Sequence, residues 1–265
     1  MIEFFAVVAP ARAGTTWFSE LLTTDRSFCY HELTALLQPY PSNLALHDWF
    51  KQQVVDHGFE LAQRRWLLQC YPTYFTRLWE RANYGQYIVG NSDGTMMRVA
   101  AGLWLLWPAM KFIFSIRNGI NVVASRYAGA SAIPPGVLAQ AKERWATNDL
   151  FQILCHRWSK SVEASITTRR WLADRQAHCF ETTLEKVTTD LEELRRLWDW
   201  LGIGAWDEYA ERNAGLQATP ANPRTNTRGV VQPEQIWERW TPEQRDLFRS
   251  TCGEAMTQFG YEIPT

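Results

Sequence analysis

Short apolar runs alternate with amphipathic segments along most of the chain. Phe4 to Ala9 and Lys111 to Ile116 are predicted as buried strands, because each is a compact apolar run closed by a turn. Gln86 to Val89 and His178 to Glu181 are two further strand candidates. Segments with helical periodicity separate these strands. This order predicts an α/β fold, in which a central parallel sheet is flanked by helices.

Several stretches carry apolar residues at helical spacing. The predicted helices are Thr15 to Thr23, Leu44 to Trp66, Thr73 to Ala82, Met96 to Trp107, Asn121 to Tyr127, Trp145 to Asp174 and Leu184 to Leu201, and a last one begins at Thr241-Pro242. Gly90 to Gly94 is predicted as a turn, and Ala218 to Val231 as a long loop of a kind that is often functional. The chain shows no repeat or linker, so residues 1–265 are expected to form a single domain.

Composition narrows the class of protein. Of the 265 residues, 46% are hydrophobic and 21% are charged, as in ordinary globular proteins. The net charge of −1 gives no global basic field for nucleic acid or for an anionic membrane, so neither is expected as a partner. Any anion site must therefore be local. The sequence leaves the oligomeric state open.

The five cysteines are scattered and lack the spacing of a zinc site, so no metal is expected. An odd, dispersed set of this kind is typical of reduced thiols. The run from Phe4 to Ala9 is too short for a signal segment, and no stretch approaches the roughly 20 apolar residues of a membrane span. A cytoplasmic protein is the expectation.

The first predicted strand leads into Pro10-Ala11-Arg12-Ala13-Gly14-Thr15-Thr16-Trp17. A strand, a glycine turn and a helix start together form an anion site, because unpaired backbone N–H groups point into the turn. Gly14 permits a close approach of the ligand, the hydroxyls of Thr15 and Thr16 add donors, and Arg12 adds a cation. The segment predicts a phosphate-binding loop.

This loop differs from that of the nucleotide triphosphatases, since Thr15 follows Gly14 where a Walker A loop has lysine. A kinase also needs an acidic residue for magnesium at a strand end, whereas the strand Lys111 to Ile116 ends in Arg117. Two anion sites at one edge of a sheet predict a nucleotide with two separated phosphate groups. A P-loop kinase for a small metabolite, using ATP and magnesium, is kept as the alternative.

These residues resemble the sulfotransferase family that uses 3′-phosphoadenosine 5′-phosphosulfate (PAPS) and releases adenosine 3′,5′-bisphosphate (PAP). The family's first loop reads roughly Pro-[Lys/Arg]-[Ser/Ala]-Gly-Thr-Thr, and here Ala11 stands between Pro10 and Arg12. The family's second motif, Arg-[Asn/Asp]-Pro…Ser, is matched by Arg117-Asn118-Gly119 and Ser125, with Gly119 in place of proline. Cys179 to Leu184, Leu197 to Ile203 and Thr227 to Gln244 are similar to later family segments.

The resemblance implies a role for each matching residue. Arg12, Ala13, Gly14, Thr15 and Thr16 would hold the 5′-phosphosulfate, and Arg117 and Ser125 the 3′-phosphate. Arg228 and Gly229 would close over that phosphate, while Trp17 and Phe180 would flank the adenine. Arg12 would also stabilise charge during transfer, electrostatically, since a guanidinium group does not release its proton in proteins.

A general base is expected, because the acceptor must lose a proton. By resemblance to the branch that includes carbohydrate and tyrosylprotein enzymes, Glu32 is the first candidate, followed by His31 and then Asp93. The acceptor is expected to be a hydroxyl or amine of a small molecule or carbohydrate, with aromatic walls from Tyr74, Trp79 and Tyr127. A binding module that has lost its chemistry is the second alternative.

Overall fold

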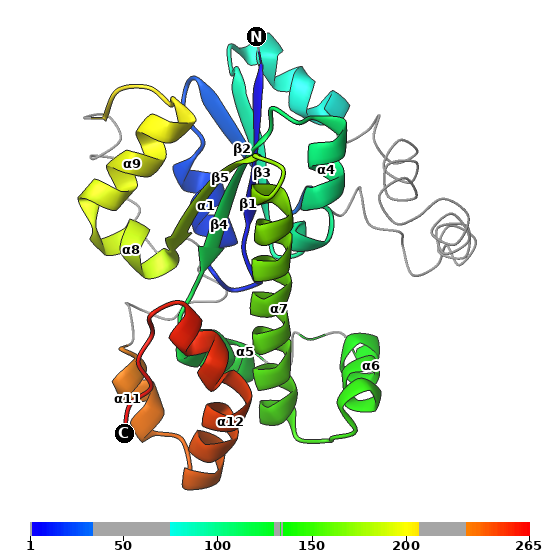
Figure 1. The fold of residues 1–265 in the computed structure, drawn as a ribbon, viewed down its shortest axis with the longest axis vertical. Coiled ribbons are helices and arrows are strands. Elements are labelled where there is room, and N and C mark those ends of the chain that lie inside the picture. Colours follow the sequence, from blue (N-terminus) through cyan, green and yellow to red (C-terminus); the bar gives the residue numbers. More distant parts are fainter. Residues whose placement is uncertain (1, 34–74, 130–132, 134, 207–231) are drawn as a thin grey trace.

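The computed structural model describes residues 2–33, 75–129, 133, 135–206 and 232–265. Its centre is a five-stranded parallel sheet with the strand order β2-β3-β1-β4-β5 (Figure 1). The strands are β1 Glu3–Val8, β2 Ser27–His31, β3 Ile88–Asp93, β4 Lys111–Ile116 and β5 His178–Thr183. The predicted α/β fold with a central parallel sheet is confirmed.

The parallel register brings the ends of the strands together. Val8 at the end of β1 pairs with Asp93 at the end of β3 and with Phe114 near the end of β4. His31 at the end of β2 pairs with Ser92. The loops that follow all five strands therefore emerge at one edge of the sheet, which is where open parallel sheets bind their ligands.

Two apolar layers enclose the sheet, because successive side chains of a strand point to opposite faces. On β1, Phe4, Ala6 and Val8 face one layer, and Phe5 and Val7 face the other. The first layer contains the helical residues 75–80 and the helices α4 Ala100–Leu106 and α7 Leu150–Ala173. The second layer contains α1 Thr15–Leu21, α8 Leu184–Thr189 and α9 Leu191–Leu201.

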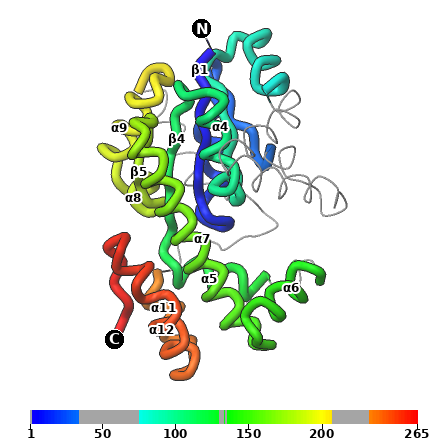
Figure 2. Tube along the Cα trace, turned by 45° about the vertical axis from the view of Figure 1, so that its right-hand side comes forward, coloured from blue at the N-terminus to red at the C-terminus, as the bar shows by residue number. Residues whose placement is uncertain are grey.

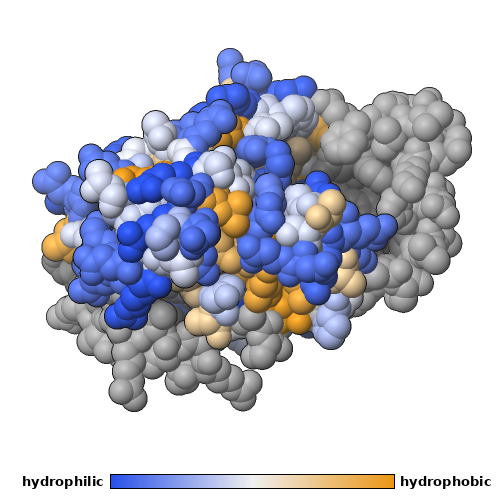
Figure 3. Space-filling model, turned by 90° about the horizontal axis from the view of Figure 1, so that it is seen from below, coloured by the Kyte–Doolittle hydropathy of each residue, from blue (hydrophilic) through white to orange (hydrophobic). Residues whose placement is uncertain are grey.

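A third apolar cluster lies beyond the carboxyl edge of the sheet, around the first half of α7. Trp158, Trp237 and Phe248 are buried in it. The surrounding helices are α5 Gly119–Ala128, α11 Pro233–Glu238 and α12 Pro242–Gln258, and α6 Pro135–Trp145 contacts α7. Both views place α5 beside α7 (Figures 1 and 2). Seen from this end, the surface is mostly hydrophilic, with small apolar areas between polar side chains (Figure 3).

Two predictions about the sheet are wrong. The prediction has no strand at β2, and it places a turn at Gly90 to Gly94, where β3 continues to Asp93. The residues of β3 pair with β1 on one side and with β2 on the other, so ladder hydrogen bonds override the local turn preference of Gly90-Asn91-Ser92. The predicted helix at 44–66 and the predicted loop at 218–231 lie outside the described residues.

Capping side chains explain where the helices differ from the prediction. The helix expected from Trp145 begins only at Leu150, because the Asp149 carboxylate accepts a hydrogen bond from the backbone N–H of Phe151 at 2.8 Å. Asp190 likewise starts a new helix within the stretch predicted as one helix. At the last helix, Thr241 forms the expected cap, with Pro242 in the first turn. None of the helices in the described ranges has the length and hydropathy that a membrane crossing needs.

Gly119 occupies the position where the resembling motif has proline. A Cβ atom at this position would lie 2.8 Å from the Trp158 ring. The N–H of Gly119 also donates to the Met256 sulfur at 3.3 Å, and proline has no N–H. The tryptophan packing of the third cluster therefore accounts for the departure from the motif.

We predict that Gly119→Ala lowers the free energy of unfolding by about 1–3 kcal/mol, because the added methyl group overpacks against Trp158. Gly136→Ala is the matched control, since no atom lies within 4 Å of its Cβ position, and it should not destabilise the protein. Urea unfolding of both variants measures the difference. Equal stability of the two variants would contradict the packing account.

Candidate functional site

The loop between β1 and α1 has the conformation of an anion cradle. Its backbone folds back at once, since the N–H of Ala13 donates to the Pro10 carbonyl oxygen at 3.0 Å. Arg12 and Gly14 both adopt positive φ, at 75° and 87°. No described side chain caps α1, so the N–H groups of its first turn point into the loop without a side-chain acceptor.

Close packing on two sides holds this loop in place. A Cβ atom on Gly94, just beyond β3, would lie 2.7 Å from the Cβ of Ala11. A Cβ atom on Gly14 would lie 2.5 Å from the Leu184 side chain at the start of α8. Ala11 is the residue that the family's first motif lacks. Gly94, which follows β3, leaves room for it because glycine has no side chain.

The second predicted anion loop, after β4, is joined directly to the first. Arg117 Nη1 donates a hydrogen bond to the Arg12 carbonyl oxygen at 3.0 Å. Burial lowers the pKa of Arg117, the nearby Glu185 opposes this shift, and Arg12 adds to it. The two arginines that were predicted to bind separate phosphates therefore stand side by side.

Glu185 on α8 supports the second loop from behind. Its Oε1 accepts a hydrogen bond from the backbone N–H of Asn118 at 3.0 Å. Its Oε2 accepts one from the Tyr261 hydroxyl at 2.7 Å, near the end of the chain. Burial, followed by the charge of Glu185, raises the pKa of Tyr261 far above its ordinary value, so the hydroxyl stays a donor. This network holds Arg117 and Asn118 in position.

The last turn of α5 contributes a further cation. A Cβ atom on Gly129 would lie 3.9 Å from Arg12 Nη2, so the Arg12 side chain reaches this turn. Ser125, the predicted partner of the 3′-phosphate, lies in the same turn, and its backbone carbonyl oxygen accepts a hydrogen bond from the Gly129 N–H. Arg126 follows it. Burial lowers the pKa of Arg126 to about 10, and Arg157 and Arg12 add to the effect.

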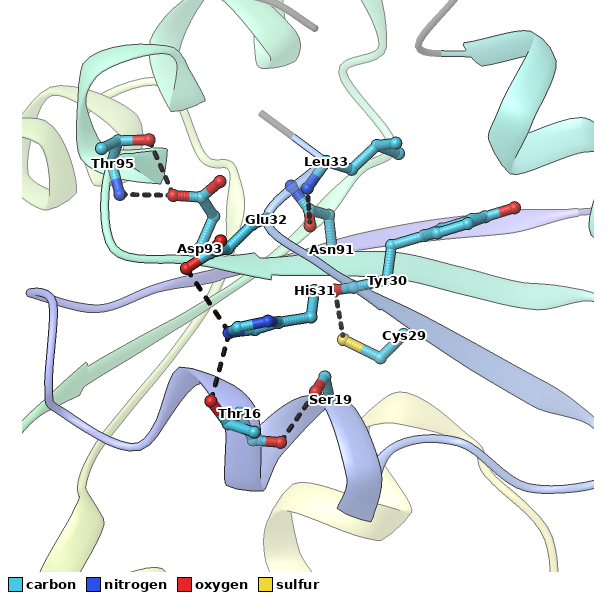
Figure 4. Close-up of polar contacts among 10 residues, drawn as sticks. All are labelled: Thr16, Ser19, Cys29, Tyr30, His31, Glu32, Leu33, Asn91, Asp93 and Thr95. Carbon is cyan, nitrogen blue, oxygen red and sulfur yellow. Dashed lines mark hydrogen bonds and ion pairs between the residues drawn. The ribbon is translucent and has the colours of Figure 1, made fainter. Parts of the chain in front are cut away.

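His31 links the phosphate loop to the first candidate base (Figure 4). His31 Nε2 lies 3.2 Å from Thr16 Oγ1 in the loop and 3.9 Å from Glu32 Oε1. The direction of the Thr16 contact depends on the histidine tautomer. The Glu32 side chain is 71% exposed, so a ligand from solvent can reach it. The structure brings three of the predicted site residues together at the end of β2.

Glu32 is held in an unusual backbone conformation, with φ at 61°. Its N–H donates to the Ser92 carbonyl oxygen at 3.1 Å, and the next N–H, of Leu33, donates to Asn91 Oδ1 at 3.1 Å. Two contacts from β3 therefore fix the turn that directs the Glu32 carboxylate toward His31. Non-glycine residues with positive φ often mark functional sites, where surrounding structure compensates the strain.

Asp93, the third candidate base, already has partners. Its Oδ1 accepts hydrogen bonds from the Thr95 N–H at 2.8 Å and from the Thr95 hydroxyl at 2.7 Å.

The position of Asp93 also corrects one argument against a kinase. The expectation considered only β4, which ends beside Arg117, whereas β3 ends in Asp93, directly beside β1. The argument from the missing lysine after Gly14 is unaffected.

The predicted aromatic contacts have different outcomes. Trp17 and Phe180 are largely buried in the apolar layer around α1 and α9, and their contact with adenine stays a prediction. Trp79 packs on Phe4, at the start of β1, so its predicted place in an acceptor pocket at the carboxyl edge is wrong. Tyr127 is 46% exposed on α5. Tyr74, Arg228 and Gly229 lie outside the described residues.

Sequence reasoning missed Arg126, Arg157, Glu185 and Tyr261. Arg126 directly follows a motif residue, so the motif could have drawn attention to it. Arg157, Glu185 and Tyr261 belong to helices or ends far along the chain, and only the tertiary fold brings them to the edge of the sheet. Within the described ranges, no group of three His, Cys, Asp or Glu side chains is arranged to hold a metal ion.

The fold brings two arginine-bearing loops together at one edge of a parallel sheet. The model of the sulfotransferase family matches residues 5–208, and the chain belongs to this family. No curated protein sequence matches the chain. The predicted family is therefore confirmed, and with it transfer of a sulfuryl group as the general activity.

Several solved sulfotransferases share the fold. The sulfotransferase domain from the curacin biosynthetic pathway is 15% identical, with a TM-score of 0.58 over 100% of this chain and 99% of that chain. A sulfotransferase from Alicyclobacillus acidocaldarius is 13% identical, with a TM-score of 0.54 over 99% of this chain and 97% of that chain. A mouse sulfotransferase complexed with PAP is 13% identical, with a TM-score of 0.53 over 96% and 85%.

We predict that Tyr261→Phe lowers the free energy of unfolding by about 1.5–3 kcal/mol, because the variant loses the part-buried hydrogen bond that the Tyr261 hydroxyl donates to the charged Glu185 carboxylate. Tyr84→Phe is the matched control, since that ring is 72% exposed and should lose nothing measurable. Chemical denaturation of the two variants compares them. A Tyr261→Phe variant as stable as the wild type would show that this contact does not support the second loop.

Proposed function

We propose that this protein transfers a sulfuryl group from PAPS to a hydroxyl or amine of a small-molecule or carbohydrate acceptor, and releases PAP. The observation that carries the proposal is the hydrogen bond between Arg117 and the Arg12 carbonyl oxygen. It places two cationic loops side by side at the carboxyl edge of the sheet. Two separated phosphate groups on one nucleotide fit this arrangement, and the PAP complex of the mouse relative agrees with it.

The residues fit the two ends of the donor in different ways. The loop from Arg12 to Thr16 offers backbone N–H groups, two hydroxyls and one guanidinium, which suits the 5′-phosphosulfate. Arg117 and Ser125 offer a guanidinium and a hydroxyl for the 3′-phosphate. We infer that Arg228 and Gly229 complete the second site, and that Trp17 and Phe180 border the adenine.

In this proposal, Glu32 accepts the proton of the acceptor hydroxyl. His31 lies between Glu32 and Thr16, so the base stands one imidazole ring away from the phosphosulfate loop. Arg12 neutralises charge that develops on the oxygens around sulfur. The donor supplies an activated sulfuryl group, so the protein's tasks are to position the reactants and to stabilise charge.

Glu32 is favoured over Asp93 on the basis of their partners. Asp93 is buried and accepts two hydrogen bonds from Thr95, which hold it in a turn. Glu32 is exposed, and its only described side-chain partner is His31. We also infer a cytoplasmic location, because the four described cysteines are free thiols. We further infer that residues 1–265 form a single domain.

We predict that Glu32→Gln lowers turnover about 100- to 10,000-fold while the Kd for PAP stays unchanged, because only the proton acceptor is lost. Glu163→Gln is the control, since it removes an exposed carboxylate that pairs with Lys160 on α7. Steady-state kinetics with PAPS and calorimetric titration with PAP give both quantities. Near-wild-type turnover of Glu32→Gln would rule Glu32 out and leave His31 and Asp93.

We also predict that Arg117→Ala weakens PAP binding about 10- to 150-fold, while binding of adenosine 5′-phosphate weakens less, and only through loss of the Arg117 contact with the Arg12 carbonyl oxygen. The reason is that the second ligand lacks the 3′-phosphate. Arg144→Ala, which removes an exposed arginine on α6, should affect neither ligand. Calorimetric titration of each variant with both nucleotides is the measurement. Equal losses for the two nucleotides would show that Arg117 does not bind the 3′-phosphate.

A further inference from the structure

Three arginines outside the family motifs continue the positive charge of the phosphate loop. Arg126 lies on the last turn of α5, Arg157 on α7, and Arg98 at the end of η3 Met96–Arg98. Arg126 interacts electrostatically with Arg12 and Arg157, and Arg157 with Arg98. We call Arg12, Arg126, Arg157 and Arg98 the arginine row.

The packing of the elements explains why these side chains meet. Helix α5 lies beside α7 in both views of the fold (Figures 1 and 2). The turn η3 rests on the same helix, since Thr168 Oγ1 of α7 donates to the Met97 carbonyl oxygen at 3.1 Å. Arg12 reaches the last turn of α5, as its distance from the Cβ position of Gly129 shows. These contacts place the elements that carry the row next to one another, from the phosphate loop through α5 and α7 to η3.

The row has no compensating charge in the part of the chain that the structure describes. No carboxylate there forms an ion pair with any of its four arginines, whereas Arg117 stands near Glu185. Arg126 and Arg157 are more than half buried, and burial lowers the pKa of both. Buried cations without partners are costly, so a ligand that carries negative charge would relieve this arrangement.

The direction of the row distinguishes it from the site of the 3′-phosphate. Arg117 follows β4, on one side of β1. Arg98 follows β3, on the other side of β1, and the candidate base Glu32 follows β2 on that same side. The row therefore leads from the position of the transferred group toward the side from which the acceptor would approach Glu32.

We propose that Arg126, Arg157 and Arg98 bind an anionic group of the acceptor, so that the substrate is a hydroxyl or amine compound with a phosphate, sulfate or carboxylate group. This inference rests on the proposed function. Guanidinium groups suit such oxyanions, because their N–H donors match two oxygens at once. A neutral acceptor would leave Arg126 and Arg157, both more than half buried, without a negatively charged partner among the described residues.

The test uses PAP to fill the nucleotide site and inorganic phosphate as the probe. Thermal unfolding of the PAP-saturated protein is followed as phosphate is added, with ionic strength held constant by chloride. Phosphate should raise the unfolding midpoint beyond the increase caused by PAP. Arg157→Gln should weaken this second effect about tenfold or more and keep the PAP effect, and Arg144→Gln on the exposed face of α6 should keep both.

Two results would overturn the proposal. The first is the absence of a phosphate effect on the PAP-saturated wild type. The second is a phosphate effect that Arg12→Ala abolishes while Arg157→Gln and Arg98→Gln retain it, because that phosphate would occupy the position of the transferred group. If PAP itself has no effect, the proposed function fails instead, and phosphate titration of Arg157→Gln without nucleotide still tests the row.

Discussion

The hydrogen bond from Arg117 to the Arg12 carbonyl oxygen joins the two halves of the site. It connects the loop after β1 to the loop after β4, and the Arg12 backbone that accepts it adopts a left-handed conformation. Such a conformation costs about 1–2 kcal/mol in a non-glycine residue, so the surrounding contacts must compensate it. Glu185 and Tyr261 provide part of that support from behind. The geometry of the proposed donor site therefore depends on residues from both ends of the chain.

The arginines of the site also differ in whether they have acidic partners. On the β4 side, Arg117 has an acidic neighbour and a network of hydrogen bonds. Arg126, Arg157 and Arg98 have no acidic partner among the described residues, and Arg98 follows β3, which pairs with β2, the strand that precedes the candidate base Glu32. In the proposed reaction, these two sides correspond to donor and acceptor. Two of the three predicted catalytic residues, Arg12 and Glu32, have positive φ, which is consistent with strain held at a working site.

The sequence located four of the five strands and the positions of the two arginine loops, because their signals are local. Compact apolar runs identify β1 and β4, and the residues that follow each strand lie in the same short segment. The hydrophobic pattern does not indicate which strands pair over long distances in the sequence. For this reason β2 was missed, and Gly90 to Asp93 was expected as a turn although β1 and β2 hold it in the sheet. For the same reason Arg157 and Tyr261 could not be assigned, since nothing near them in the sequence indicates the site. Trp79 was misplaced because its aromatic character gives no information about which end of the sheet it covers.

The central claim is that this edge of the sheet binds a nucleotide with phosphate groups at both the 3′ and 5′ positions. Thermal unfolding with PAP, compared with ATP and magnesium, tests it most directly. A ligand at about 100 times its Kd stabilises a protein by about 2.7 kcal/mol, which is readily detected as a rise in Tm. The account predicts such a rise with PAP and little change with ATP and magnesium. A larger rise with ATP and magnesium than with PAP would contradict it and favour the kinase alternative.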